Sequence, residues 1–185
     1  MYSKEIAQQG VFFLLKDRLK VYAAFGKLRL ASLEVFSSVL GYIMADSTIV
    51  WPEFIALIIG GFLVTASSNG FNQVIERDLD KLMDRTKGRP IPSGKMTARE
   101  GFIVAVVMGI VGLYLLFAFT NPLAGILGSL ALFMYVAIYT PMKRVSPFAV
   151  LIGAFPGAIP PMLGYIAATG TFALAPGILF AVQFI

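Results

Sequence analysis

The sequence has no cysteine and no histidine, and only 14% of its 185 residues are charged. These absences exclude disulfide bridges, zinc sites built on Cys or His, heme ligation by His, and Cys or His catalysis. Soluble domains carry about 25% charged residues. The low charge and the 58% hydrophobic content therefore argue against a soluble globular protein. Any chemistry must come from carboxylates, amides, hydroxyls, lysine, arginine and a metal that prefers oxygen ligands.

Long apolar segments dominate the chain instead. A membrane-spanning helix needs roughly 20 mainly apolar residues, and five segments meet this requirement: residues 30–46, 53–75, 101–119, 122–139 and 147–168. A sixth begins near Phe172 and is still apolar at Ile185. The sequence predicts an all-α, polytopic transmembrane helix bundle. Residues 1–28 are expected to form a cytoplasmic amphipathic segment, and residues 29–185 a transmembrane domain that is C-terminally incomplete.

The basic residues are confined to three places. Six lysines and arginines precede the first span, seven lie at the end of the second span and in the following loop, and Lys143 and Arg144 separate the fourth and fifth spans. The positive-inside rule assigns these three places, and the N-terminus, to the cytoplasmic side. The net charge of +5 is explained in this way, and we expect no nucleic-acid partner.

A polar stripe marks the end of the second span. Its centre is formed by Asn72, Glu76 and Asp80, which fall within about 80° of one another on a continuous helix. The stripe extends back to Thr65 and Asn69 and forward to Asp84, whereas Asp78 points away. We expect the helix to continue through this segment without a break.

Carboxylates one turn apart repel each other, and ionisable groups near the membrane are costly. A divalent cation removes both problems, and oxygen ligands from carboxylates and an amide are typical of Mg²⁺. The stripe therefore predicts a Mg²⁺ site formed by Asn72, Glu76, Asp80 and Asp84. The alternative is a solvated helix end with ordinary charge pairs.

Two cytoplasmic loops supply cations. Arg85 and Arg89 lie in a Pro/Gly-punctuated loop and are candidates for binding a metal-bound diphosphate, although the positive-inside rule alone could explain them. Tyr139 and Lys143 place an aromatic ring beside a cation. This pair suits a site where a diphosphate leaves and an allylic cation develops. The alternative is an interfacial tyrosine beside a loop lysine. Pro141 is expected to end the fourth span.

Two intramembrane features remain. The fifth span contains Pro156, Pro160 and Pro161, which predict a kinked or broken helix that lines a cavity. Glu34 lies near the start of the first span, where snorkelling or a contact with the helix dipole is the simpler explanation.

These motifs resemble those of the UbiA-type intramembrane prenyltransferases. The resemblance lies in Asn72-x3-Glu76-x3-Asp80, Arg85-Thr86-x2-Arg89-Pro90-x-Pro92-Ser93-Gly94 and Tyr139-x3-Lys143. Within that superfamily the chain is most similar to the heme O synthases, through Thr140-Pro141-Met142-Lys143-Arg144 and Gly153-Ala154-x-Pro156-Gly157-Ala158-x-Pro160-Pro161. Many superfamily members have Asp where this chain has Glu76, which leaves the set of metal ligands open.

The resemblance implies a nine-helix bundle with a second acidic motif beyond Ile185. It implies Mg²⁺-dependent transfer of a farnesyl group from farnesyl diphosphate to a vinyl group of heme B, in a bacterial plasma membrane, with the mouth of the site on the cytoplasmic side. The implied catalytic residues are Asn72, Glu76, Asp80, Tyr139 and Lys143; Arg85, Arg89 and Lys143 would bind the diphosphate, and Asn69 the cofactor. Heme A synthase or a terminal oxidase assembly is an implied partner.

Three alternatives stay open from the sequence. The same fold could prenylate an aromatic quinone precursor such as 4-hydroxybenzoate. A CDP-alcohol phosphotransferase would also place several Asp residues on a membrane helix, but the expected upstream Asp-Gly and Ala-Arg pairs are absent. A non-enzymatic transporter with a broken fifth span would show no diphosphate chemistry.

Overall fold

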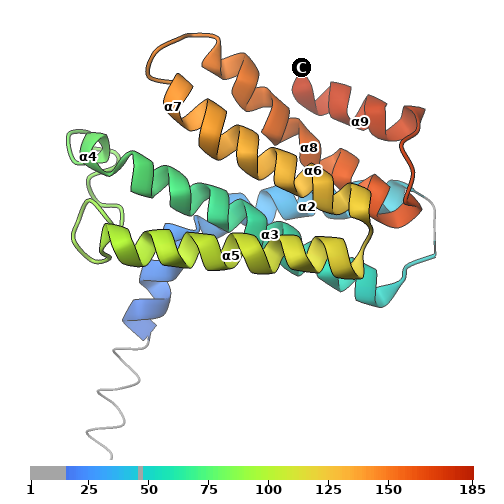
Figure 1. The fold of residues 1–185 in the computed structure, drawn as a ribbon, viewed down its shortest axis with the longest axis horizontal. Helices are drawn as coiled ribbons and strands as arrows, with labels where there is room; N and C mark the ends of the chain where they lie inside the picture. The colour runs from blue at the N-terminus through green and yellow to red at the C-terminus, as the bar shows by residue number, and fades with distance from the viewer. Residues whose placement is uncertain (1–15, 46–47) are drawn as a thin grey trace, which may run out of the picture.

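Helices and their connections make up the computed structural model, which describes residues 16–45 and 48–185 (Figure 1). No strand occurs within those ranges, so the prediction of an all-α bundle is confirmed. The predictions for residues 1–15, which include Lys4 and the start of the amphipathic segment, lie outside the described residues, as does Asp46. Residues 16–25 are helical.

The remaining helices follow the predicted spans. They are α2 (Leu28–Met44), α3 (Trp51–Ile75), α4 (Arg77–Asp80), α5 (Ala98–Phe119), α6 (Pro122–Phe133), the π-helix η1 (Met134–Tyr139), α7 (Thr140–Met142), α8 (Ala149–Thr169) and α9 (Leu174–Phe184). Among the described residues, four helices are long and apolar enough to cross a membrane: α3, α5, the continuous α6–η1–α7 unit and α8. The chain is thus a multi-pass membrane protein. Helix α2 has 17 residues, at the lower end of the usual range of about 17–25.

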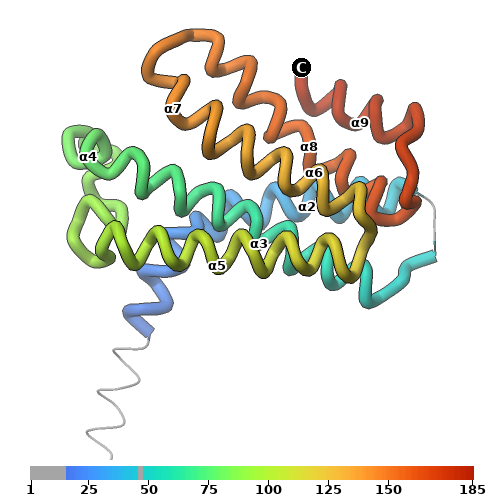
Figure 2. Tube along the Cα trace, in the orientation of Figure 1, coloured from blue at the N-terminus to red at the C-terminus, as the bar shows by residue number. Residues whose placement is uncertain are grey.

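The helices pack as neighbouring pairs (Figure 2). Helix α3 packs mainly against α5, and α2 against α8. The interior of the bundle is apolar and includes Tyr42, Leu57, Leu116 and Ile166. Many large apolar side chains face outward instead, such as Phe36 at 59% exposure, because lipid rather than water surrounds these faces. Close contacts between the helices therefore hold the bundle together.

Two glycines allow α2 and α8 to touch. A Cβ atom added to Gly164 would lie 1.8 Å from the Ser38 carbonyl oxygen, and one added to Gly41 would lie 2.0 Å from the Pro161 carbonyl oxygen. No side chain fits at either position unless the helices separate. Small residues at membrane helix crossings have this role.

We expect Gly164→Ala to destabilise the bundle by about 1–3 kcal/mol, because the added methyl group must push α2 away from α8. The melting temperature in detergent micelles measures this effect. Gly177→Ala is the matched control, since a Cβ at Gly177 meets nothing within 4 Å. Equal melting temperatures for the two variants would contradict the close crossing.

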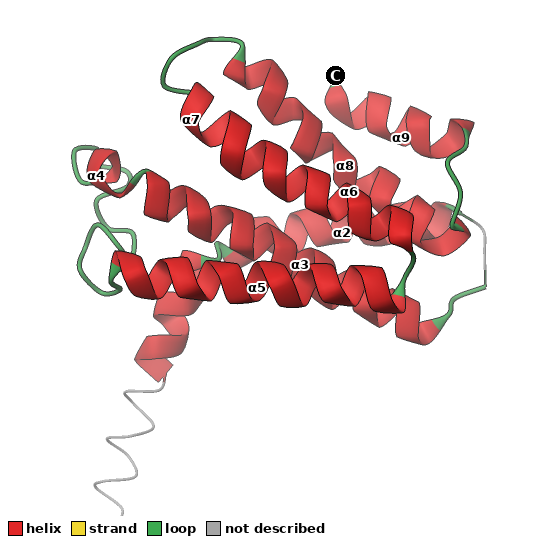
Figure 3. Cartoon of the chain, viewed as in Figure 1, coloured by secondary structure: helices red, strands yellow, loops and turns green. Residues whose placement is uncertain are grey.

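Loops and turns join the helices (Figure 3), and several helix ends carry local sequence signals. Thr97 caps α5 by accepting a hydrogen bond from the Glu100 amide, and Asn121 caps α6 by accepting one from the Ala124 amide. Both are favoured N-cap residues. Gly170 ends α8 at φ 67°, a left-handed conformation that glycine adopts without strain. Asn121 and Gly170 lie in short connections at the end of the bundle opposite α4, whereas Thr97 begins α5 at the end that carries α4.

The structure tests two predictions about proline. The fourth span ends at Met142, one residue after Pro141, so Pro141 lies at the end of this span as predicted, and the helix widens into η1 just before it. Helix α8 was predicted to be kinked or broken; it is not broken, since it runs from Ala149 to Thr169 with three prolines inside it. Pro156 and Pro160 line a cavity, a place where irregular backbone hydrogen bonding is tolerated in a membrane.

Candidate active site

The side chains of the polar stripe stay on one face, although the helix that carries them has a break that was not predicted from the sequence. Helix α3 ends at Ile75, and Glu76 (φ −94°, ψ 4°) separates it from the single turn of α4. The predicted continuous helix is therefore wrong. The Glu76 amide still donates to the Asn72 carbonyl at 3.0 Å, and the Asp80 amide to the Glu76 carbonyl at 2.9 Å. Because these spacings of four residues persist, the three side chains remain on one face.

The three side chains of the stripe are buried, whereas the neighbouring Asp78 side chain is exposed. Asn72 is 2% exposed, Glu76 9% and Asp80 3%. The Asp78 side chain, on the opposite face, is 74% exposed and pairs with Lys81. Two buried carboxylates on one turn are unfavourable without positive partners. The structure provides a partner for each from a different segment.

Arg89 pairs with Asp80. Its Nη1 atom lies 2.9 Å from Oδ1 and 2.7 Å from Oδ2 of Asp80. The loop after α4 folds back to make this contact, because the Thr86 hydroxyl donates to the Asp80 carbonyl at 3.0 Å. Ile91 and Met96 also bury against Phe25. The loop is thus anchored on both sides of Arg89.

Lys143 pairs with Glu76 and with Asn72. Its ammonium lies 2.8 Å from Glu76 Oε2 and donates to Asn72 Oδ1 at 2.8 Å. The same ammonium is 5.2 Å from the centre of the Tyr139 ring, a cation–π distance. The predicted proximity of Tyr139 and Lys143 to the stripe is therefore observed, although these residues lie about 70 positions away along the chain.

Two predicted site residues do not join this cluster. Asp84 is 97% exposed and pairs with Lys87 at 2.6 Å, and Arg85 is also exposed. The reason is that α4 ends at Asp80, so the stripe does not extend to Asp84. In the part of the chain that the structure describes, no group of three or more acidic side chains could hold a metal.

Lys27, which was predicted to belong to the amphipathic segment, is a further candidate site residue. Burial lowers the pKa of the Lys27 ammonium, and the nearby Arg89 and Lys143 cations lower this pKa further, while Asp80 and Glu76 raise it. Lys27 has φ 49°, the only left-handed non-glycine residue described. Such strain concentrates at functional sites. A positive φ is not visible in a sequence, so no signal could have identified it.

Asn69 holds the turn that carries Lys27. Its side-chain amide donates to the Gly26 carbonyl at 3.3 Å, and Gln73 donates to the Phe25 carbonyl at 2.7 Å. Both side chains are buried in α3. Their visible role in the structure is to fix the segment before α2 against the stripe.

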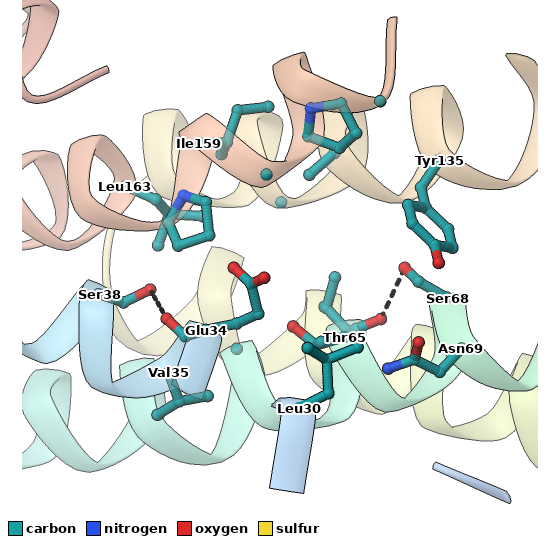
Figure 4. Close-up of a pocket in the computed structure, with 18 of the residues that line it drawn as sticks. Leu30, Glu34, Val35, Ser38, Thr65, Ser68, Asn69, Tyr135, Ile159 and Leu163 are labelled. Atoms are coloured by element: carbon teal, nitrogen blue, oxygen red, sulfur yellow. Dashed lines mark hydrogen bonds between the residues drawn. The ribbon is translucent and has the colours of Figure 1, made fainter. Parts of the chain in front are cut away.

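Tyr139 also lines an apolar cavity of about 340 Å³, which Figure 4 shows from the side of Glu34 and Tyr135. It runs between α2, α3, η1 and α8 and is lined by Tyr135, Ser68, Ile159 and Leu163, among others. A Cβ at Gly153 would lie 2.7 Å from the Tyr139 ring, so this glycine leaves the ring its place. Figure 4 also shows the Glu34 carboxylate pointing into the cavity, which contradicts the snorkelling interpretation.

The side chains of the stripe can supply some of the oxygen ligands of a Mg²⁺ ion. Asn72, Glu76 and Asp80 offer only oxygen atoms on one buried face, the ligands Mg²⁺ prefers. The two carboxylates are now neutralised by Lys143 and Arg89, and an anionic diphosphate could draw these cations away. Mg²⁺ commonly completes its shell with water and phosphate oxygens, so the residues fit a shared metal and diphosphate.

Comparisons with known proteins agree with this geometry. Residues 35–185 match the UbiA prenyltransferase family. The chain is 49% identical over 158 residues to the protoheme IX farnesyltransferase of Christiangramia forsetii, covering 85% of this chain and 52% of that protein. It is 45% identical over 172 residues to that of Cytophaga hutchinsonii, covering 92% and 60%. The chain thus spans little more than half the length of these curated relatives.

Solved structures show the same fold. A digeranylgeranylglyceryl phosphate synthase matches with a TM-score of 0.82 at 21% identity, over 91% of this chain and 59% of that one. A UbiA homolog from Archaeoglobus fulgidus bound to GPP and Mg²⁺ matches with a TM-score of 0.70 at 15% identity, over 89% and 60%. The fold of the bundle, its buried polar stripe and the match over residues 35–185 lead to one assignment: the chain belongs to the UbiA prenyltransferase family.

Proposed function

We propose that the protein transfers a farnesyl group from farnesyl diphosphate to a vinyl group of protoheme IX and so makes heme O. The observation that carries the proposal is the buried pairing of Glu76 with Lys143 and of Asp80 with Arg89, next to an apolar cavity that is lined by Tyr139, the neighbour of Lys143. This arrangement suits a substrate with a polyanionic head and an apolar tail. The names of the two relatives support protoheme as the acceptor.

Asn72, Glu76 and Asp80 would hold Mg²⁺. The bound metal would withdraw electron density from the diphosphate oxygens and make the diphosphate a better leaving group. The A. fulgidus homolog bound to GPP and Mg²⁺ supports this cofactor. Asp84 lies outside the cluster, so we propose only the three stripe residues as ligands.

The cations around the stripe would stabilise the departing diphosphate. Lys143 and Arg89 already contact the stripe, and Lys27 lies near both. Fixed positive groups aimed at developing negative charge lower the barrier without reorganisation. Arg85 is exposed and could reach only a part of the diphosphate that extends from the mouth.

The cavity residues would act on the farnesyl group. When its C1–O bond breaks, the electron pair leaves with the diphosphate and an allylic cation remains near Tyr139. The ring of Tyr135 lies 5.2 Å from that of Tyr139, so two aromatic faces are available to stabilise the cation. A vinyl carbon of the acceptor then forms the new C–C bond, and water adds to the resulting cation with loss of a proton.

We also propose that the mouth of the site faces the cytoplasm of a bacterial plasma membrane. Figure 1 shows α4, the start of α5 and the α7–α8 connection at the same end of the bundle. The segments rich in lysine and arginine are therefore gathered at one end, as the positive-inside rule requires. Farnesyl diphosphate is water-soluble at its head and could enter from that side.

Lys27→Met should raise the KM for farnesyl diphosphate about tenfold and change kcat less, because one cation of the diphosphate site is lost. Initial rates at varied farnesyl diphosphate concentration give both constants. Lys20→Met is the control, since Lys20 is exposed and pairs with Asp17. An unchanged KM in the Lys27 variant would remove Lys27 from the site.

Product mass tests the proposed function. Membranes containing the protein, in the full length that its gene encodes, receive farnesyl diphosphate, Mg²⁺ and either heme B or 4-hydroxybenzoate. We expect farnesylated and hydrated heme and no prenylated hydroxybenzoate. Prenylated hydroxybenzoate alone would assign the fold to an aromatic acceptor, and no prenylated product with either acceptor would contradict prenyl transfer to both.

A further inference from the structure

Glu34 is an acidic residue inside the cavity that the proposed mechanism has not yet used. It lies in α2 about 9 Å below the helix start, from a rise of roughly 1.5 Å per residue. It lines the cavity together with Thr65, Tyr135 and Pro160. In Figure 4 its carboxylate points from α2 toward the space between Thr65 and the α8 wall.

The Glu34 carboxylate has no partner among the residues that the structure describes: no hydrogen bond or ion pair to it occurs there. The nearby Ser38 hydroxyl is engaged elsewhere, because it donates to the Glu34 backbone carbonyl at 3.3 Å. A lone carboxylate in a membrane cavity is costly and usually functional. The Glu34 carboxylate makes no hydrogen bond or ion pair with the described part of the bundle. We therefore expect it to act on the molecule that occupies the cavity.

We propose that Glu34 is the base that accepts a proton from the water that adds to the prenylated acceptor. This inference rests on the proposed function, because it concerns the second half of that reaction. The diphosphate site cannot supply the base. Its carboxylates are each held by a cation at the mouth, whereas Glu34 faces the apolar chamber where the acceptor cation would form.

The step balances as follows. Formation of the bond between farnesyl C1 and the terminal vinyl carbon leaves a positive charge on the adjacent vinyl carbon. A water oxygen donates a lone pair to that carbon and forms the C–O bond. One proton of this water passes to the Glu34 carboxylate, and the product keeps a neutral hydroxyl group. No oxidant or reductant takes part.

Position and charge both favour this role. The negative carboxylate would stabilise the cation before water attacks, and Thr65, which lines the same cavity, offers a hydroxyl that could hold the water. Tyr139 lies beside Lys143 of the diphosphate site and next to Tyr135, where the allylic cation would form first. Without the Glu34 carboxylate to accept the water proton, the acceptor cation would instead pass a carbon-bound proton to a water molecule and give an alkene that lacks the hydroxyl.

Glu34→Gln tests the inference, because it keeps the size of the side chain and removes the base. The protein, in the full length its gene encodes, is assayed in membranes with farnesyl diphosphate, Mg²⁺ and heme B. The measured quantity is the ratio of hydrated farnesyl heme to the product lighter by one water. Two control variants are assayed in the same way. Glu34→Asp keeps a carboxylate at this position, and Glu53→Gln removes a carboxylate from the first turn of α3, at the end of α3 opposite the polar stripe.

We expect Glu34→Gln to lower the hydrated-to-dehydrated ratio about 100-fold, the usual scale for loss of a general base. Glu34→Asp should restore most of the hydrated product, and Glu53→Gln should match the wild type. An unchanged ratio in Glu34→Gln, with active wild type, overturns the role of Glu34 alone. A wild type that makes neither product overturns the proposed function, and the inference with it.

Discussion

Asp80→Asn should lower farnesyl transfer by about 10²–10³-fold, the scale seen when one fixed electrostatic group is lost from a catalytic site. Two effects combine. The variant loses one of the two charged side chains of the stripe, and Arg89 keeps at most one of its two contacts, at 2.9 and 2.7 Å, because an Asn side chain has a single acceptor oxygen. Initial rates at saturating heme, over a range of Mg²⁺ concentrations, measure the loss.

Asp78→Asn is the matched control for Asp80→Asn. Asp78 lies in the same turn of α4, but its side chain is 74% exposed and faces away from the stripe. The same chemical change there should leave the rate within twofold of the wild type. If Asp78→Asn were as damaging as Asp80→Asn, the effect would come from general disturbance of α4. If Asp80→Asn were as active as the wild type, Asp80 would not belong to the site.

Lys143→Met should lower the rate of the proposed farnesyl transfer about 100-fold, because Lys143 contacts three side chains of the site. It pairs with Glu76, donates to Asn72 and lies over the Tyr139 ring. Methionine keeps the length of the side chain and removes its charge. Among the described residues, the buried Glu76 then keeps one ion-pair partner, Arg144 at 3.9 Å, and a poorly compensated buried carboxylate is strongly unfavourable.

Two further variants separate the role of Lys143 in catalysis from its role in stability. Lys87→Met removes an exposed lysine that pairs with the exposed Asp84, and it should leave the rate unchanged. Lys143→Arg keeps the charge and should recover part of the activity with the melting temperature of the wild type. A Lys143→Met protein that melts normally and reacts normally would contradict the proposed role.

The spans and the stripe could be predicted because both depend on local sequence. Apolar runs give helix length directly, and the spacing of Asn72, Glu76 and Asp80 places them on one face even though α3 ends before Glu76. Arg89 and Lys143 were candidates for the diphosphate site from their chemistry and their cytoplasmic loops, and the family resemblance assigned both to the same site as the stripe. Periodicity contains no information on which loop reaches which helix.

The features that could not be predicted depend on contacts between distant segments. Lys27 reaches the site because α3 side chains hold the turn before it, at Gly26 and Phe25. Glu34 faces a cavity because α2 crosses α8 at Gly41 and Gly164, which fixes the rotation of α2. Helix α8 continues through its prolines for a similar reason, since Pro156 and Pro160 line a cavity, where irregular backbone hydrogen bonding is tolerated.

Mg²⁺-dependent binding of radiolabelled farnesyl diphosphate tests the central claim most directly, because it needs neither the acceptor nor turnover. Wild type and Glu76→Gln are compared in detergent, with Mg²⁺ or with a chelator. We expect Mg²⁺ to tighten binding at least about tenfold in the wild type and to have no effect in Glu76→Gln, at equal melting temperature. Equal Mg²⁺-dependent binding by both proteins would contradict a diphosphate site built on this stripe.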